Sequence, residues 1–183
     1  MKDRINRWLE RLDNQSERVK ALFGNLNDAE LEKKISPKEW SIAQNLKHLM
    51  VVNNSYFPTI ESVRSGKPKL NFLSKFSFMR GVFGKLILDS VQPDRKRKMQ
   101  TFPVWEPKEL TIENNVVEEF LKHQEKIKQL IADSEDLLLS SAFLPSPANR
   151  NIAYSLEDAF EIIVTHGERH INQAAEILKK IGH

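Results

Sequence analysis

Apolar residues recur every three or four positions through several long stretches of this chain. This spacing places them on one face of an α-helix. The pattern predicts helices over residues 3–23, 41–63, 111–132 and 155–181, and a shorter one near residues 77–90. The alternating Val, Ile and Thr segments that are typical of strands are almost absent. Four long helices with one apolar face each favour an all-α fold, a four-helix bundle.

Residues with strong local preferences mark the starts and breaks of these helices. Ser41 precedes the second helix and has Gln44 three positions later, which is the pattern of a capping box. Ser155 and Asp158 stand in the same relation at the start of the last helix. Pro58 falls inside the second helix, and we expect a kink there because proline has no N–H to donate.

Two segments between the helices have no helical period. Residues 65–110 form a long connector between the second and third helices, and a connection of this length lets those two helices run parallel. Its charge is uneven, because ten basic residues lie from Arg64 to Lys98 against only Asp89 and Asp94. Residues 140–154 contain two prolines and are predicted to be a loop.

Composition narrows the class of protein. The chain has 183 residues, which favours a single domain over residues 1–183. No apolar run approaches the ~20 residues of a membrane span, and no apolar signal segment follows the charged N-terminus. We therefore expect a cytoplasmic protein without membrane contact. Cysteine is absent, so any metal ligands must be histidine or carboxylate, and a net charge of +3 does not by itself indicate nucleic-acid binding.

The last predicted helix carries two histidines, His166 and His170, four residues apart. About one helical turn separates them, so both imidazoles leave the same face, the apolar face that also holds Ile163 and Ala174. Two buried imidazoles must satisfy their ring nitrogens in little space. They can do so as hydrogen-bonded core residues or as ligands of one divalent metal ion, and the pair alone does not decide between these interpretations.

Two further histidines lie on the other long helices. His48 is beside the apolar face of the second helix, and packed helix axes lie roughly 8–10 Å apart, so His48 can reach an ion held by the last helix. His123 follows Phe120 by three residues and precedes Ile127 by four, so it could also face inward. We interpret His123 as a structural or surface residue, not as a ligand.

Two motifs together resemble the DinB/YfiT-like superfamily: WSIAQNLKHL at residues 40–49 and, far downstream, HGERHINQ at residues 166–173. Members of this superfamily are bacterial metal-binding four-helix bundles with one histidine in the second helix and His-x-x-x-His in the last. The resemblance covers nearly the whole chain and implies three metal ligands, His48, His166 and His170. Gln173 matches a position that is often Gln in relatives.

The resemblance implies a metal-dependent enzyme that acts on a small molecule. Relatives include metal-dependent hydrolases and transferases that use low-molecular-weight bacterial thiols. Three imidazoles leave a coordination position open, at which water or a thiol could be activated. Imidazole suits zinc, nickel, copper and iron, and we favour zinc or nickel. Relatives often dimerise, so a homodimer is one expected assembly.

Other functions stay open at this stage. The site could belong to a non-catalytic metal-binding or stress-associated module, because no acid or base can be placed beside the metal from sequence. The basic connector could bind an anionic partner, whereas we do not expect a nucleic-acid site there. Gln44, Asn45 and Glu168 are candidates for contacts to the ligands or the substrate. A helix cap, a polar helix edge and a surface charge are their simpler interpretations.

Overall fold

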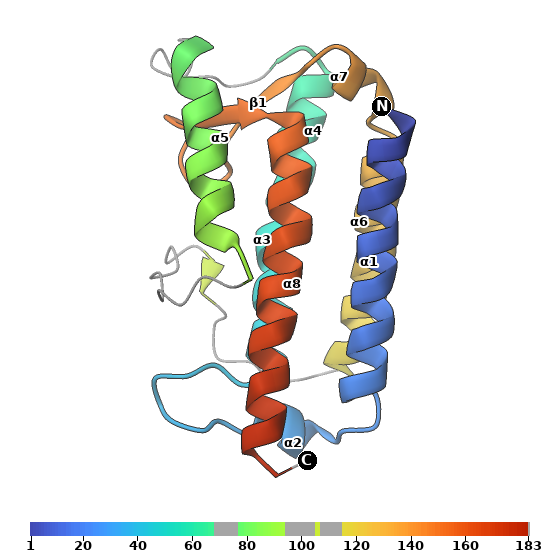
Figure 1. Ribbon diagram of the computed structural model, residues 1–183, viewed down its shortest axis with the longest axis vertical. Coiled ribbons are helices and arrows are strands. Elements are labelled where there is room, and N and C mark those ends of the chain that lie inside the picture. The colour runs from blue at the N-terminus through green and yellow to red at the C-terminus, as the bar shows by residue number, and fades with distance from the viewer. Residues whose placement is uncertain (68–76, 94–104, 107–114, 183) are drawn as a thin grey trace.

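Four long helical segments form a bundle in the computed structural model, which describes residues 1–67, 77–93, 105–106 and 115–182. The first and last segments run in one direction and the other two run in the opposite direction (Figure 1). The second and third segments are therefore parallel, and the predicted four-helix bundle is confirmed. The segments are α1 (Lys2–Phe23), α3 (Ile42–Asn54) continued by α4 (Tyr56–Arg64), α6 (Val116–Ala132) and α8 (Leu156–Lys180).

A fifth sizeable helix, α5 (Ser77–Val91), lies outside the bundle and packs against α8, as Figure 1 shows. It agrees with the short helix predicted near residues 77–90. Among the described residues, no helix is both long enough and apolar enough to span a membrane. The remaining short elements are α2 (Asp28–Glu32), α7 (Glu135–Leu139), β1 (Phe143–Pro145) and β2 (Ala153–Ser155).

The second predicted helix is broken into two, α3 and α4, at Ser55. The predicted kink at Pro58 thus lies three residues earlier in the chain. Proline at position 58 cannot donate to the carbonyl of Asn54, and its ring crowds that carbonyl. The break follows at the next residue, where the Ser55 hydroxyl donates to the carbonyl of Val52 at 2.5 Å.

One helix start and one loop were predicted wrongly from the sequence. The third helix was expected to begin at residue 111, but it begins at Val116. Asn115 is its N-cap, because its side-chain oxygen accepts hydrogen bonds from the backbone N–H groups of Val117 and Glu118. Residues 107–114 lie outside the described residues. The segment 140–154, predicted as a loop, contains the antiparallel pair β1 and β2, with Leu144 opposite Tyr154. Strands of three residues are too short to show a period in sequence.

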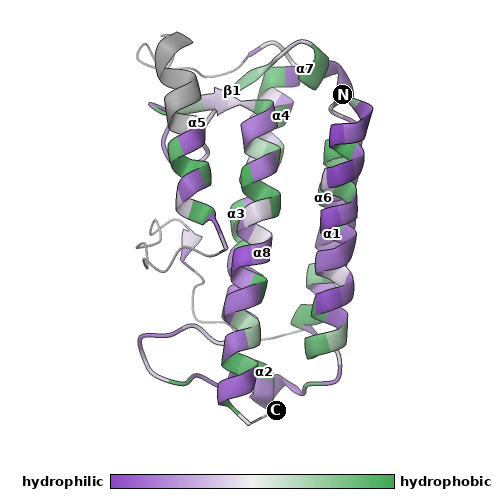
Figure 2. Cartoon of the chain, in the orientation of Figure 1, coloured by the Kyte–Doolittle hydropathy of each residue, from purple (hydrophilic) through white to green (hydrophobic). Residues whose placement is uncertain are grey.

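Two clusters of buried apolar side chains fill the bundle, and a layer of polar side chains separates them. On α8 the first cluster ends at Val164 and the second begins at Ile171; on α1 the corresponding residues are Leu12 and Val19. Figure 2 shows that the outer surface of α1 is largely hydrophilic. The polar layer, as we call it, consists of Gln15, His48, Gln124, His166 and His170.

Some polar groups of this layer form hydrogen bonds with other groups of the protein. Gln15 donates to the carbonyl of Val164 at 2.9 Å and accepts a hydrogen bond from Gln124 at 3.3 Å. A Cβ at position 167 would lie 2.2 Å from Oε1 of Gln15, so Gly167 allows α1 to approach α8 this closely. His166 and His170 lie on the side of α8 that faces α3, and His48 comes from α3.

Candidate metal centre

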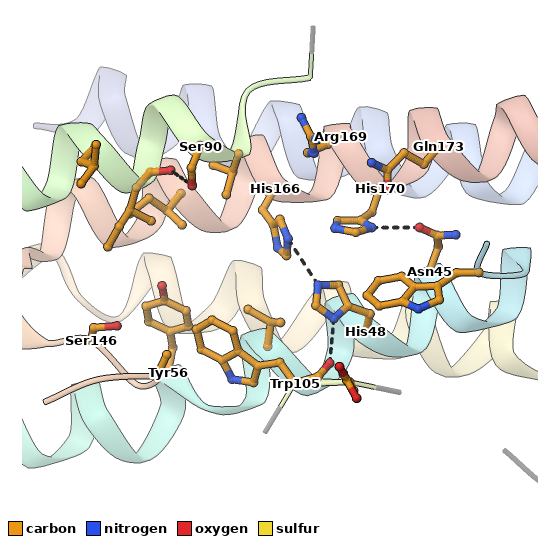
Figure 3. Close-up of a pocket in the computed structure, with 18 of the residues that line it drawn as sticks. Asn45, His48, Tyr56, Ser90, Trp105, Ser146, His166, Arg169, His170 and Gln173 are labelled. Carbon is orange, nitrogen blue, oxygen red and sulfur yellow. Dashed lines mark hydrogen bonds between the residues drawn. The ribbon is translucent and has the colours of Figure 1, made fainter. Parts of the chain in front are cut away.

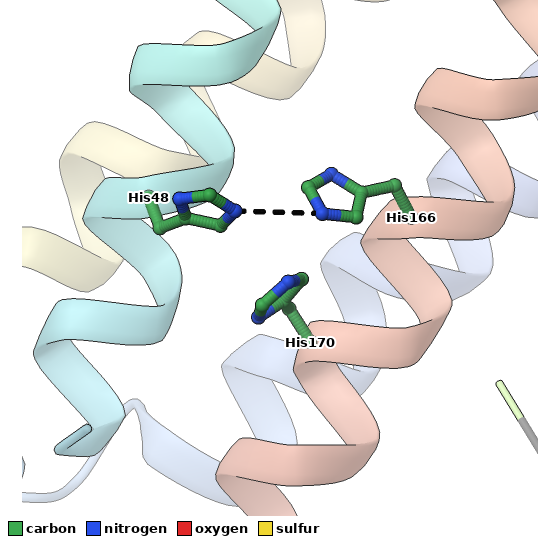
Figure 4. A group of neighbouring side chains, drawn as sticks. All are labelled: His48, His166 and His170. Atoms are coloured by element: carbon green, nitrogen blue, oxygen red, sulfur yellow. Dashed lines mark hydrogen bonds between the residues drawn. The ribbon is translucent and has the colours of Figure 1, made fainter. Parts of the chain in front are cut away.

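Three histidines from two helices converge at the middle of the bundle. His48 comes from α3, and His166 and His170 come from successive turns of α8 (Figure 4). Their ring centroids are 4.5 to 5.1 Å apart, and one nitrogen from each ring lies within 4.8 Å of the others. His48, His166 and His170 are 2%, 9% and 7% exposed, so the nitrogens are largely shielded from bulk solvent.

The hydrogen bonds of His48 fix its tautomer. Its Nδ1 lies 2.8 Å from the backbone carbonyl of Trp105. A carbonyl can only accept, so Nδ1 carries the proton and donates. In the neutral ring Nε2 then has a free lone pair, and this atom faces Nε2 of His166 at 3.4 Å. A proton held outside the cluster, with a lone pair directed into it, is the usual arrangement of a metal-ligating histidine.

A relay of two hydrogen bonds fixes His170 in the same way. The side-chain nitrogen of Asn45 donates to the carbonyl of Ser41 at 2.9 Å, which orients the amide. The amide oxygen of Asn45 therefore faces His170, and Nδ1 of His170 lies 2.9 Å from it. An amide oxygen accepts, so His170 donates from Nδ1 and leaves the lone pair of Nε2 for the cluster.

The donor set fits a divalent metal ion. Ligand nitrogens about 2.0–2.1 Å from a tetrahedral ion lie about 3.4 Å from each other, and the nitrogens of His48 and His166 have this separation. The three nitrogens of the whole set lie within 4.8 Å of one another, close enough to share one ion. Neutral imidazoles without thiolates or carboxylates suit zinc, nickel, copper or iron.

All three imidazoles are kept neutral by their surroundings. Burial, together with the nearby charges of His48 and Arg169, lowers the pKa of His166 to about 3. Burial also lowers the pKa of His170 well below its ordinary value. Burial lowers the pKa of His48, and its hydrogen bond to Trp105 offsets part of this shift. Metal binding requires neutral imidazole, so the folded protein needs no proton release from these rings at neutral pH.

Aromatic rings cover one side of the cluster. Trp40 lies nearly parallel to the ring of His170, with centroids 5.7 Å apart, and is tilted against His48 at 4.7 Å. Trp105 contacts His48 through its backbone carbonyl. These contacts restrict the rotation of the imidazoles. Trp40, the first residue of the first motif, is therefore part of the site.

The histidines open onto a cavity of about 690 Å³ between α3, α4, α5 and α8. Figure 3 shows the three rings along one part of its wall. Arg169 lines the cavity beside the histidines and donates to the carbonyl of Gln92 at 2.6 Å, which ties α8 to the end of α5. A cavity of this size holds a small molecule.

The other polar candidates from the sequence have different roles. Gln44 is the capping-box partner of Ser41, as the simpler interpretation held. Glu168 pairs with Arg11 of α1 at 2.7 Å on another face of α8. The simpler interpretation was wrong for Asn45, which is 2% exposed and holds His170. Gln173 lines the cavity.

His123 lies apart from the cluster, on α6. It is 6% exposed, and its Nε2 is 3.1 Å from the side-chain oxygen of Asn54, while its Nδ1 has no hydrogen-bond partner among the described residues. The edge of its ring also contacts Phe57. Burial, with a smaller effect of the Lys126 charge, lowers the pKa of His123 to about 4.

This shift predicts acid sensitivity from a residue outside the metal centre. Histidine in the unfolded chain has a pKa of about 6.5, so between about pH 6.5 and pH 4 the unfolded state binds more protons and stability falls as the pH falls. At pH 5 the loss from His123 is about 2 kcal/mol. With chelator present, the decrease in unfolding free energy from pH 7 to pH 5 should be smaller by about this amount in His123→Gln. Equal decreases in both proteins, measured by urea unfolding, would contradict it.

Comparisons with known proteins agree with the fold. The chain is a four-helix bundle with a buried three-histidine group in its core, an arrangement that is consistent with a divalent-metal site. The family model of the DinB superfamily matches residues 11–174, and the chain belongs to this superfamily. No curated protein matches the chain.

A solved structure has the same fold. The chain is similar to YfiT from Bacillus subtilis, described as a probable metal-dependent hydrolase with an unusual four-helix bundle topology. The TM-score is 0.59 at 15% sequence identity, and the match covers 100% of this chain and 90% of that one. At this identity the likeness establishes the fold.

Proposed function

We propose that this protein is a metal-dependent enzyme that acts on a small molecule, with His48, His166 and His170 as ligands of one zinc or nickel ion. The observation that carries the proposal is the convergence of three neutral imidazoles on the wall of a cavity. Three protein ligands with open space beside them are typical of catalytic sites, whereas structural sites have a fourth protein ligand. The description of YfiT as a probable metal-dependent hydrolase supports the same class.

A bound divalent ion would supply Lewis-acid chemistry, which activates water or a thiol near neutral pH. The protein contributes the rest. The carbonyl of Trp105 accepts the Nδ1 proton of His48, and the side chain of Asn45, oriented by Ser41, accepts that of His170, so the Nε2 lone pairs of these two rings face inward. The ring of Trp40 covers two of the ligands and limits the access of water. These roles serve hydrolysis and thiol transfer equally.

Two reactions are compatible with this site, and we favour neither over the other. In hydrolysis the activated group is water; in thiol transfer it is a low-molecular-weight thiol. The test begins with metal analysis of protein purified without an affinity tag, followed by two screens of the loaded protein. One screen measures hydrolysis of ester and amide substrates, and the other measures transfer of bacillithiol to an electrophile.

The expected result is about one ion per chain and turnover in one of the screens. His123→Ala is the matched control, because it removes a buried histidine outside the cluster, and it should retain both metal and turnover. Metal without turnover in either screen would favour the alternative, a non-catalytic metal-binding module. Absence of metal from protein exposed to zinc and to nickel would end the proposal.

A further inference from the structure

The cavity has a second polar region, separated from the histidines. Three hydroxyl groups meet there, those of Tyr56, Tyr154 and Ser146. The tyrosine oxygens are 2.9 Å apart and hydrogen-bonded, and the hydroxyl of Ser146 lies near that of Tyr154. The three residues are 2%, 1% and 4% exposed. We call this group the hydroxyl cluster; Figure 3 shows Tyr56 and Ser146 on the other side of Trp105 from the histidines.

Local structure brings the three hydroxyls together. Tyr56 is the first residue of α4, directly after the break at Ser55. Tyr154 lies in β2, and Ser146 follows β1, where its backbone N–H donates to the carbonyl of Ile152 at 2.7 Å. The hydroxyl cluster therefore depends on the helix break and on the strand pair, both of which position it at the cavity wall.

Counting protons shows that the hydroxyl cluster has a donor to spare. Each hydroxyl carries one proton, so three are available. One hydrogen bond joins the two tyrosine oxygens and uses one proton. Whichever tyrosine donates in this bond, the O–H of the other tyrosine has no acceptor among the described residues. A buried donor left without an acceptor is costly, and the cavity is where a bound molecule could supply one.

The hydroxyl cluster acts as a donor and does not act as a base. Burial raises the pKa of Tyr154 to about 12 and raises that of Tyr56 well above its usual value. The charge of Asp158 contributes to the shift of Tyr154, so a negative charge already lies near the cluster. An anionic group on a ligand would be repelled there, and a neutral oxygen would not.

The space between the hydroxyl cluster and the histidines is apolar and elongated. Eight residues separate His48 from Tyr56 along two nearly continuous helices, which corresponds to about 12 Å at 1.5 Å per residue. The wall between them is formed mainly by aliphatic and aromatic side chains: Val52, Ile87, Val91, Trp105, Ile152 and Ile162.

We propose that the hydroxyl cluster is the subsite that selects the substrate. The cavity takes an elongated small molecule with a hydrocarbon middle and a neutral carbonyl oxygen at the end held by Tyr56, Tyr154 and Ser146. Its other end is the reactive end and lies at the histidines. That placement rests on the proposed function, whereas the recognition of the carbonyl by the hydroxyls is independent of it.

The main test compares two chelating probes on the zinc-loaded protein. Both are hydroxamic acids with a chain of about eight carbons, matched to the length of the cavity; one chain ends in a methyl group and the other carries a methyl ketone. The ketone probe should bind about three- to tenfold more tightly by calorimetry, the gain of one hydrogen bond. The triple variant Tyr56→Phe/Tyr154→Phe/Ser146→Ala has no hydroxyl left in the cluster, so it should lose this gain and bind the methyl-ended probe as the unmodified protein does.

Ser90→Ala is the matched control, because Ser90 also lines the cavity but donates to the carbonyl of Ile87 in its own helix at 2.6 Å. This variant should keep the full preference for the ketone. Equal affinity of the two probes for the unmodified protein, or an unchanged preference in the triple variant, would overturn the proposal.

A second measurement does not need the metal. The chain has two tyrosines, both in the hydroxyl cluster, so protein labelled with ¹³C at tyrosine Cζ gives two signals. Titration of metal-free protein with 2-octanone should shift both signals, and octane-1-sulfonate, which carries an anion in place of the ketone, should not. If hydroxamates fail to bind but the ketone shifts the tyrosines, the proposed function fails and the subsite stands. Unmoved tyrosine signals would overturn the subsite whatever the metal does.

Discussion

Replacing His170 with alanine should reduce the zinc content from about one ion per chain to nearly none. His170 supplies one of three lone pairs, and Asn45 and Trp40 hold its ring in place. Without it, His48 and His166 remain 3.4 Å apart, but two ligands hold an ion far less tightly than three. Metal analysis after dialysis against a weak chelator measures the loss.

The same replacement should remove the stabilisation that zinc gives to the fold. An ion that binds only the native state adds about 2.7 kcal/mol when its free concentration is 100 times the Kd. The melting temperature of the unmodified protein should therefore rise with added zinc, and that of His170→Ala should not. His123→Ala is the control and should behave like the unmodified protein. Loss of zinc from the control with retention in His170→Ala would mean that the wrong histidines were chosen.

The sequence was sufficient to predict the histidine cluster because a helical period carries directional information. The spacing of His166 and His170 and their apolar neighbours place both rings on one inward face. Bundle geometry then brings His48 within reach from α3. The period could not predict the hydrogen bonds of Gln15, because Gln15 meets Gln124 and the carbonyl of Val164 only when α1, α6 and α8 are packed together.

The parts of the cavity that come from irregular structure were not predictable. Trp105 reaches His48 with a backbone carbonyl, which every residue has and no motif marks. Tyr154 and Ser146 are brought together by two three-residue strands inside a segment whose prolines indicate a loop. Tyr56 is positioned by the break at Ser55, which the sequence indicated only as a kink at Pro58. Local periodicity thus located the histidines of the cluster, and long-range packing determined what lies opposite them.

Replacing Asn45 with leucine should lower the zinc affinity about 10- to 100-fold, although Asn45 would not touch the ion. Leucine has a similar volume but cannot accept the proton of His170. Asn45 now receives that proton because its own N–H₂ group is turned towards the carbonyl of Ser41. Once the acceptor is lost, the proton of His170 can move to Nε2, and the lone pair that faces the cluster disappears.

Gln44→Ala provides the matched control, because Gln44 is the neighbouring polar residue and serves only the capping box of α3. It should lower the stability of the protein by about 1 kcal/mol, as other losses of a helix cap do, and leave the zinc affinity within about twofold. Zinc competition with a chromogenic chelator measures both variants. Nitrogen NMR of the zinc-loaded protein gives a second readout, since Nδ1 of His170 should be protonated in the unmodified protein. If Asn45→Leu binds zinc as tightly as Gln44→Ala, the relay from Ser41 through Asn45 does not orient His170.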